Sequence, residues 1–137
     1  MASEQLDDIV TGEGYAVGTL DALGDNYGFR KIRRGLGVTA FGINAIVMPP
    51  GHETGRHYHD EQEETYFVHR GTVEFEFGDG DKHVLGPGGV ARVDPATVRK
   101  IRNASQEEDA VYVIAGGKDG YVGRDGQLPP GEQRSMP

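Results

Sequence analysis

Residues 51–71, GHETGRHYHDEQEETYFVHRG, contain three closely spaced side chains of the types that bind metal ions. His57 and His59 are two positions apart, which on a β-strand places both imidazoles on the same side of the sheet. Glu64 follows after a four-residue turn. If its strand pairs back antiparallel on the first, the three side chains converge on one interior point. Two imidazoles and one carboxylate suit Zn, Ni, Mn or Fe(II) without selecting one of them. The stretch therefore predicts a divalent-metal site at these three residues.

Short runs of alternating apolar and polar residues, bounded by Gly, Pro and Asp, lie on both sides of this stretch. Helical periodicity is hard to find in any window of eleven residues along the chain. The clearest run is residues 72–77, where apolar side chains alternate with glutamates. A Gly-Asp-Gly-Asp turn then leads into a hairpin strand at 83–85. Further strands are expected at 38–48, 63–69, 90–93, 98–102 and 110–115. Many short strands with regular turn signals predict an all-β sandwich or barrel.

Composition limits the classes of function. The chain has 137 residues, 22 of them glycine, and no cysteine, which excludes disulfides, thiolate metal sites and a cysteine nucleophile. A formal charge of −8 argues against nucleic-acid binding, which needs clustered Lys and Arg. The basic residues of 30–34 are interpreted as a solvated strand face or turn.

The chain is expected to form one domain with irregular ends. We expect a flexible segment at residues 1–14, a β-barrel domain at 15–115 and a Gly/Pro-rich tail at 116–137 that packs over the barrel or a neighbouring subunit. The acidic N-terminus does not resemble a signal peptide, and no run approaches the length of about 20 apolar residues that a membrane span needs. A soluble, cytoplasmic protein without membrane contact is the expectation.

The spacing of residues 51–71 resembles the first motif of the cupin superfamily: Gly, five residues, His-x-His, three or four residues, Glu, six residues, Gly. The matching positions are Gly51, His57, His59, Glu64 and Gly71. Glu63 would replace Glu64 only in the shorter form of the motif. The resemblance covers roughly residues 38–115 and implies a double-stranded β-helix, or jelly-roll, barrel. It also implies a homodimer, because small cupins commonly dimerise.

The second cupin motif is matched only in part. The positions that resemble it are Gly88, Asp94-Pro95-Ala96, Arg99 and Asn103. Its usual Pro-x-Gly is degraded, and Arg99 stands where cupins place their third histidine ligand. A guanidinium has no lone pair to give, and its fixed charge opposes a nearby cation.

Three arrangements follow from Arg99. In the first, His57, His59 and Glu64 hold a metal, and Arg99 faces the open coordination positions to clamp an anionic ligand. In the second, Arg99 pairs with Glu64, the site is metal-free, and the pocket binds a small carboxylate or phosphate. In the third, the interior polar groups only satisfy one another, and the role of the protein lies at a surface or an oligomer contact.

Other side chains are candidates for supporting roles. His83, on the hairpin, is the spare candidate for a fourth ligand. Tyr66 has the parity of Glu64, so it is either a hydrogen-bonding or proton-shuttling group or a core aromatic; with Arg99 it is a candidate catalytic residue. The predicted ligand pocket is lined by Arg99, Tyr66, Phe75, Phe77 and Met48.

The expected function is that of a small cupin barrel that binds a divalent metal ion and a small organic ligand. Resemblance admits a metal-dependent enzyme of oxidoreductase type, such as a dioxygenase, or of isomerase type. The alternative is a metal-free module that binds or senses a small molecule, with Arg99 paired to Glu64.

Overall fold

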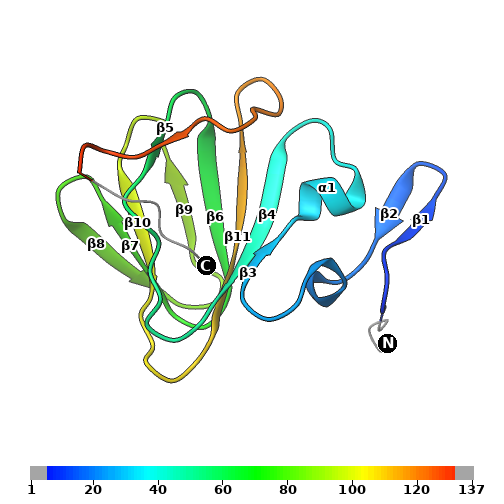
Figure 1. Cartoon of the computed structure of the whole chain (residues 1–137), viewed down its shortest axis with the longest axis horizontal. Coiled ribbons are helices and arrows are strands. Elements are labelled where there is room, and N and C mark those ends of the chain that lie inside the picture. Colours follow the sequence, from blue (N-terminus) through cyan, green and yellow to red (C-terminus); the bar gives the residue numbers. More distant parts are fainter. Residues whose placement is uncertain (1–5, 132–137) are drawn as a thin grey trace.

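The computed structural model describes residues 6–131, whose strands form two main antiparallel β-sheets and two short two-stranded ones (Figure 1). The larger sheet has the strand order β3-β4-β11-β6-β9 and the smaller one β10-β7-β8. The larger sheet consists of β3 (Gly28–Arg30), β4 (Gly42–Met48), β11 (Ala110–Gly117), β6 (Glu63–Arg70) and β9 (Val90–Val93). The smaller consists of β10 (Arg99–Asn103), β7 (Val73–Phe77) and β8 (Asp81–Leu85). This arrangement confirms the predicted all-β class.

The hydrophobic core lies between the two sheets. Tyr66 and Val68 of β6 and Tyr112 of β11 meet Phe75 of β7 and Ile101 of β10, and all five are at most 1% exposed. The sequence pattern explains this, because β6 and β7 alternate buried and more exposed residues along their length. One face of each sheet is therefore apolar and packs against the other.

Two motif positions hold the corners of the fold. Gly71 has a φ of +76°, and a Cβ there would lie 2.5 Å from the carbonyl oxygen of Asp109, so only glycine fits. Asn103 is fully buried, and its amide donates to the carbonyls of Met48, Pro49 and Glu108. These contacts join the end of the smaller sheet to β4 and to the loop before β11.

The N-terminal third contains elements that the sequence did not predict. These are β1 (Val10–Gly12), β2 (Tyr15–Val17), the 3-10 helix η1 (Leu20–Leu23), β3 and the helix α1 (Ile32–Leu36). Each has at most five residues, which is too few to show a helical or strand periodicity in the sequence. The expectation that the basic residues of 30–34 are solvated holds for Lys31 and Arg34, which are exposed, but not for Arg30. Arg30 ends β3, is 4% exposed and donates to the carbonyl of Asn26, while Arg33 and Arg34 lie in α1.

The C-terminal tail crosses the end of the molecule (Figure 1). Its strand β12 (Gly126–Gln127) pairs antiparallel with β5 (Tyr58–His59). The tail thus reaches the segment that carries the two candidate histidine ligands. Residues 1–5 of the segment expected to be flexible, and 132–137 of the tail, lie outside the described part of the chain. Among residues 6–131, no helix is long and apolar enough to cross a membrane.

Candidate metal centre

His57, His59 and Glu64 come together in the interior, where one ligand atom from each lies within 4.8 Å of the others. The route differs from the one that the sequence predicted. β5 does not pair with β6; the main chain of His57 instead exchanges two hydrogen bonds with Arg99 of β10, at 2.9 and 2.8 Å. The two histidines therefore lie beside the smaller sheet. Glu64 projects from the larger sheet, which faces the smaller one.

The hydrogen bonds of the two histidines fix which ring nitrogen is available. Nδ1 of His57 donates to the carbonyl oxygen of Gly55 at 3.2 Å. Nδ1 of His59 lies 2.8 Å from Oδ1 of Asp125. Burial lowers the pKa of His57, as does the nearby charge of Arg99. His57 is thus held in its neutral form, with the lone pair of Nε2 available to a cation.

Asp125, in the tail, is the functional residue that the sequence analysis missed. It lies 66 positions from His59 in a segment without a motif, so no local signal pointed to it. Burial alone would raise the pKa of its carboxyl group, but hydrogen bonds from Gln62, from the main-chain N–H of Glu61 and from His59 lower it well below its usual range. An ionised Asp125 accepts the Nδ1 proton of His59, which directs Nε2 into the site.

Glu64 has three partners on a single oxygen. Oε1 accepts a hydrogen bond from the hydroxyl of Tyr66 at 2.7 Å and lies 3.6 Å from Nη2 of Arg99 and 3.2 Å from Nε2 of His59. Burial would raise the pKa of Glu64, but these neighbours outweigh it and lower the pKa. Glu64 is therefore an ionised carboxylate in the interior, as a metal ligand must be.

The donor set fits a divalent cation. Nε2 of His59 is buried and makes no hydrogen bond with the residues that the structure describes, although it faces the Glu64 carboxylate at 3.2 Å. A lone pair opposite a carboxylate is stable only with a positive charge between them, either a proton on His59 or a metal ion. Burial opposes the proton, whereas Glu64 and Asp125 favour it and raise the pKa of His59. Ligand atoms on one ion are separated by about 4 Å or less, so the cluster would contract slightly around a metal.

Arg99 does not face the cavity beside this cluster. It is 0% exposed, and its guanidinium donates to the carbonyls of Pro95 at 3.1 Å and Asp94 at 3.3 Å, next to Glu64. The arrangement in which Arg99 clamps a ligand therefore lacks the required geometry. The Arg99–Glu64 contact of the second arrangement is present.

The cavity that contains the cluster has a volume of about 800 Å³. Tyr66 lines it together with the two histidines and Glu64. Met48, Phe75 and Phe77, which were expected in its wall, do not line it. Met48 is fully buried in the core instead.

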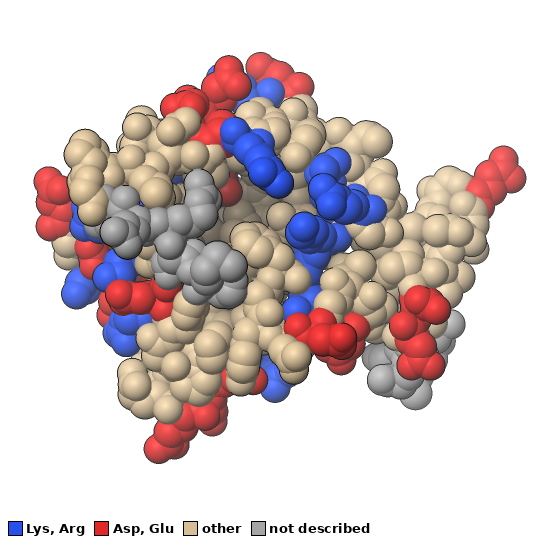
Figure 2. All heavy atoms as spheres, viewed as in Figure 1, with Lys and Arg blue, Asp and Glu red and all other residues tan. Residues whose placement is uncertain are grey.

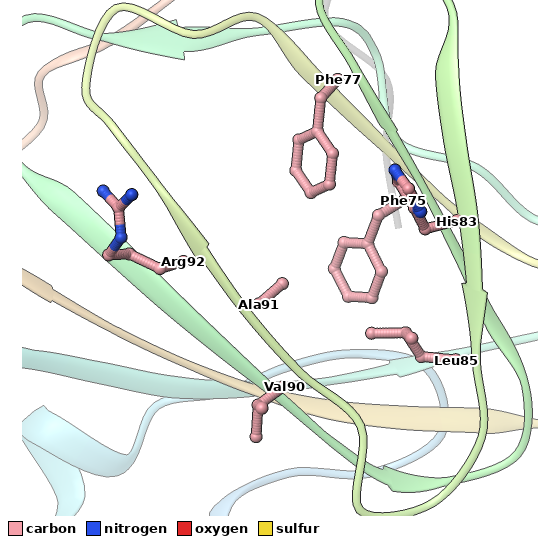
Figure 3. Close-up of a pocket in the computed structure, with 7 residues that line it drawn as sticks. All are labelled: Phe75, Phe77, His83, Leu85, Val90, Ala91 and Arg92. Carbon is pink, nitrogen blue, oxygen red and sulfur yellow. The ribbon is translucent and has the colours of Figure 1, made fainter.

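His83, the spare candidate for a fourth ligand, lies elsewhere. It belongs to β8 and lines a second pocket of about 310 Å³ with Phe75, Phe77 and Leu85 (Figure 3). The close-up shows its imidazole beside the aromatic rings, and its ring centre is 6.3 Å from that of Phe77. The structure does not bring His83 to the His57, His59 and Glu64 cluster.

Comparison with known proteins agrees with this architecture. A search of curated protein sequences gives no match. Among solved structures, an uncharacterised Klebsiella pneumoniae protein with a double-stranded β-helix domain has a TM-score of 0.64 at 19% identity, over 82% of this chain and 95% of its own. A DMSP lyase of Ruegeria pomeroyi has a TM-score of 0.56 at 21% identity, over 65% of this chain and 43% of its own.

A recombinant oxalate oxidase in complex with glycolate has a TM-score of 0.57 at 14% identity, over 65% of this chain and 46% of its own. The chain thus spans less than half the length of the lyase and oxidase chains, and these likenesses concern the double-stranded β-helix fold alone. The model of the cupin domain family matches residues 45–116, more than half of the chain. This protein belongs to the cupin family.

Proposed function

We propose that this cupin binds a divalent metal ion through His57, His59 and Glu64 and holds a small organic molecule in the cavity beside it. The observation that carries the proposal is the orientation of the two imidazoles. Both Nδ1 atoms are engaged, by Gly55 and Asp125, so both Nε2 atoms are left for the ion next to an ionised Glu64.

The remaining residues of the site support these ligands. Asp125 orients His59, and Tyr66 orients Glu64. When bound, a divalent ion would supply Lewis acidity to an oxygen of the ligand. The cavity of about 800 Å³ lies within the range of sites for small organic molecules.

A second candidate function rests on the contact between Arg99 and Glu64. A buried guanidinium 3.6 Å from the carboxylate already supplies one positive charge. With a proton on His59, the two charges would balance Glu64 and Asp125 without a metal. The protein would then be a metal-free module that binds a small molecule in the same cavity.

Metal analysis of untagged protein separates the two candidates. The wild type is dialysed against Mn, Fe, Ni or Zn, and bound metal is measured together with the melting temperature. We expect about one ion per chain and a raised melting temperature, because a ligand at 100 times its Kd stabilises the folded state by about 2.7 kcal/mol. His57→Ala and Glu64→Gln should lose the ion.

His83→Ala is the matched control, because it removes an imidazole that lies outside the cluster. It should retain the ion and the melting-temperature shift. A folded wild type that takes up none of the four metals would overturn the metal proposal and favour the metal-free module.

A further inference from the structure

Four basic side chains within residues 6–131 line the cavity of this acidic protein. They are Lys31, Arg33, Arg34 and Arg124, from the start and body of α1 and from the tail. The chain as a whole has a net charge of −8, so a group of four basic side chains is unusual for its composition. Figure 2 shows basic side chains gathered along one side of a hollow in the surface.

These cations are not neutralised by acidic groups of the described chain. Lys31, Arg34 and Arg124 form no ion pair among residues 6–131, and Arg33 stacks over the ring of Tyr121 at 3.9 Å. Among residues 6–131, the acids that line the cavity are Glu64 and Asp125, and both are engaged with the histidine cluster. The cations are therefore available to a negatively charged ligand.

The wall of the cavity combines apolar side chains with a buried hydroxyl group. Phe29, Ile46 and Tyr112 lie side by side on β3, β4 and β11 in direct register, and all three line the cavity. The hydroxyl of Tyr112 is buried and has no hydrogen-bond partner in the described part of the chain. A buried hydroxyl without a partner is costly, so it is a natural donor to a ligand.

We infer that the cavity selects a small organic anion with an apolar body, a carboxylate or a phosphate ester. Its charge is recognised by the cationic rim of Lys31, Arg34 and Arg124, and its body contacts the apolar wall, with Tyr112 donating a hydrogen bond. The inference rests on the proposed function in that both need a small molecule in this cavity. The cationic rim acts independently of the metal.

Three probes with the same apolar body test the inference: 2-naphthyl phosphate, 2-naphthoate and the neutral 2-naphthamide. Binding is measured by calorimetry on the full chain, first in EDTA and then with Zn. In EDTA we expect both anions to bind at least about tenfold more tightly than the amide, and this preference to fall as salt is raised. The relative affinity of the two anions identifies the preferred head group.

Single substitutions test which residues cause the preference for anions. Lys31→Gln, Arg34→Gln and Arg124→Gln should each weaken anion binding about three- to fivefold and leave binding of the amide unchanged. Arg70→Gln is the matched control, since Arg70 is exposed and does not line the cavity. Tyr112→Phe should weaken all three probes without lowering the melting temperature, because it removes an unpaired hydroxyl.

Equal affinities for anion and amide, a loss in Arg70→Gln as large as in the rim variants, or no binding of any probe would overturn the inference. Failure of the proposed metal site has a different signature. If the protein prefers anions in EDTA but takes up no metal, the metal proposal is overturned and the anion site stands. If it takes up metal but does not prefer anions, the anion site is overturned and the metal proposal stands.

Discussion

Glu64 is the residue on which the candidate site depends, because one buried oxygen contacts Tyr66, Arg99 and His59. These neighbours offset the cost of burying a carboxylate and keep it ionised. The same neighbours have opposite effects on a metal ion. Tyr66 orients the ligand, whereas Arg99 places a fixed positive charge close to it.

Replacing Tyr66 with Phe tests the orienting role. The change removes the 2.7 Å hydrogen bond to Oε1 and leaves the aromatic packing in place. We expect metal affinity to fall by about 10- to 100-fold, the usual effect of losing a hydrogen bond to a metal ligand. Competition with a chelating dye measures it. An unchanged affinity in a folded variant would show that Tyr66 serves only the core.

Replacing Arg99 with His tests whether the positive charge of Arg99 opposes metal binding. The change removes a charge 3.6 Å from Glu64 and introduces a nitrogen donor, so the same titration should show a higher metal affinity. Stability should fall, because the carbonyls of Asp94 and Pro95 lose their donor. Arg102→His, on the same strand but paired with Glu74, is the control. No gain over this control would contradict the account.

At the scale of elements, the tail strand β12 supports the site, since it lies against β5 and delivers Asp125 to His59. The sequence could predict that His57, His59 and Glu64 meet, because they lie within eight residues at the spacing of the cupin motif. The hairpin that was expected to bring them together is absent from the described residues, since β5 pairs with β12 and His57 bridges to Arg99. Asp125 could not be predicted, because its contact depends on how the tail returns over the fold. The sequence also placed Arg99 in the site. Its hydrogen bonds to the carbonyls of Asp94 and Pro95 could not be predicted, because they depend on how the chain turns at residues 94–95.

Asp125→Asn tests the contribution of the tail. The amide is neutral and can present either oxygen or nitrogen to Nδ1, so the orientation of His59 is no longer enforced. We expect metal affinity to fall by about 10- to 100-fold, measured in the chelator competition. Asp119→Asn, an exposed acid of the same tail, should behave as wild type. Equal losses in both variants would point to a general effect of charge.

At the scale of the whole molecule, the larger sheet carries Glu64, and the segment with His57 and His59 runs beside the smaller sheet. The corners keep the two sheets in place. The alternation in β6 and β7 was strong enough for sequence to predict the all-β class. The N-terminal elements were not predictable, because strands of three residues gain their stability from β4 and other neighbours and not from their own pattern. The homodimer that the cupin resemblance implies stays a prediction, which sedimentation analysis can test.

Asn103→Ala tests the corner between the sheets. The side chain is fully buried, and its removal leaves the carbonyls of Met48, Pro49 and Glu108 without their donor. The free energy of unfolding should fall by about 2–3 kcal/mol in a urea titration. The exposed His83→Ala should change it by less than about 0.5 kcal/mol. A loss for Asn103→Ala as small as that would mean that this corner is not required.

We propose that His57, His59 and Glu64 share one metal ion between the two sheets. Anomalous diffraction from crystals soaked with Mn or Zn tests it most directly. We expect a peak about 2.0–2.2 Å from Nε2 of His57, Nε2 of His59 and an oxygen of Glu64. A peak elsewhere, or full metal uptake in solution with no peak among these three side chains, would contradict it.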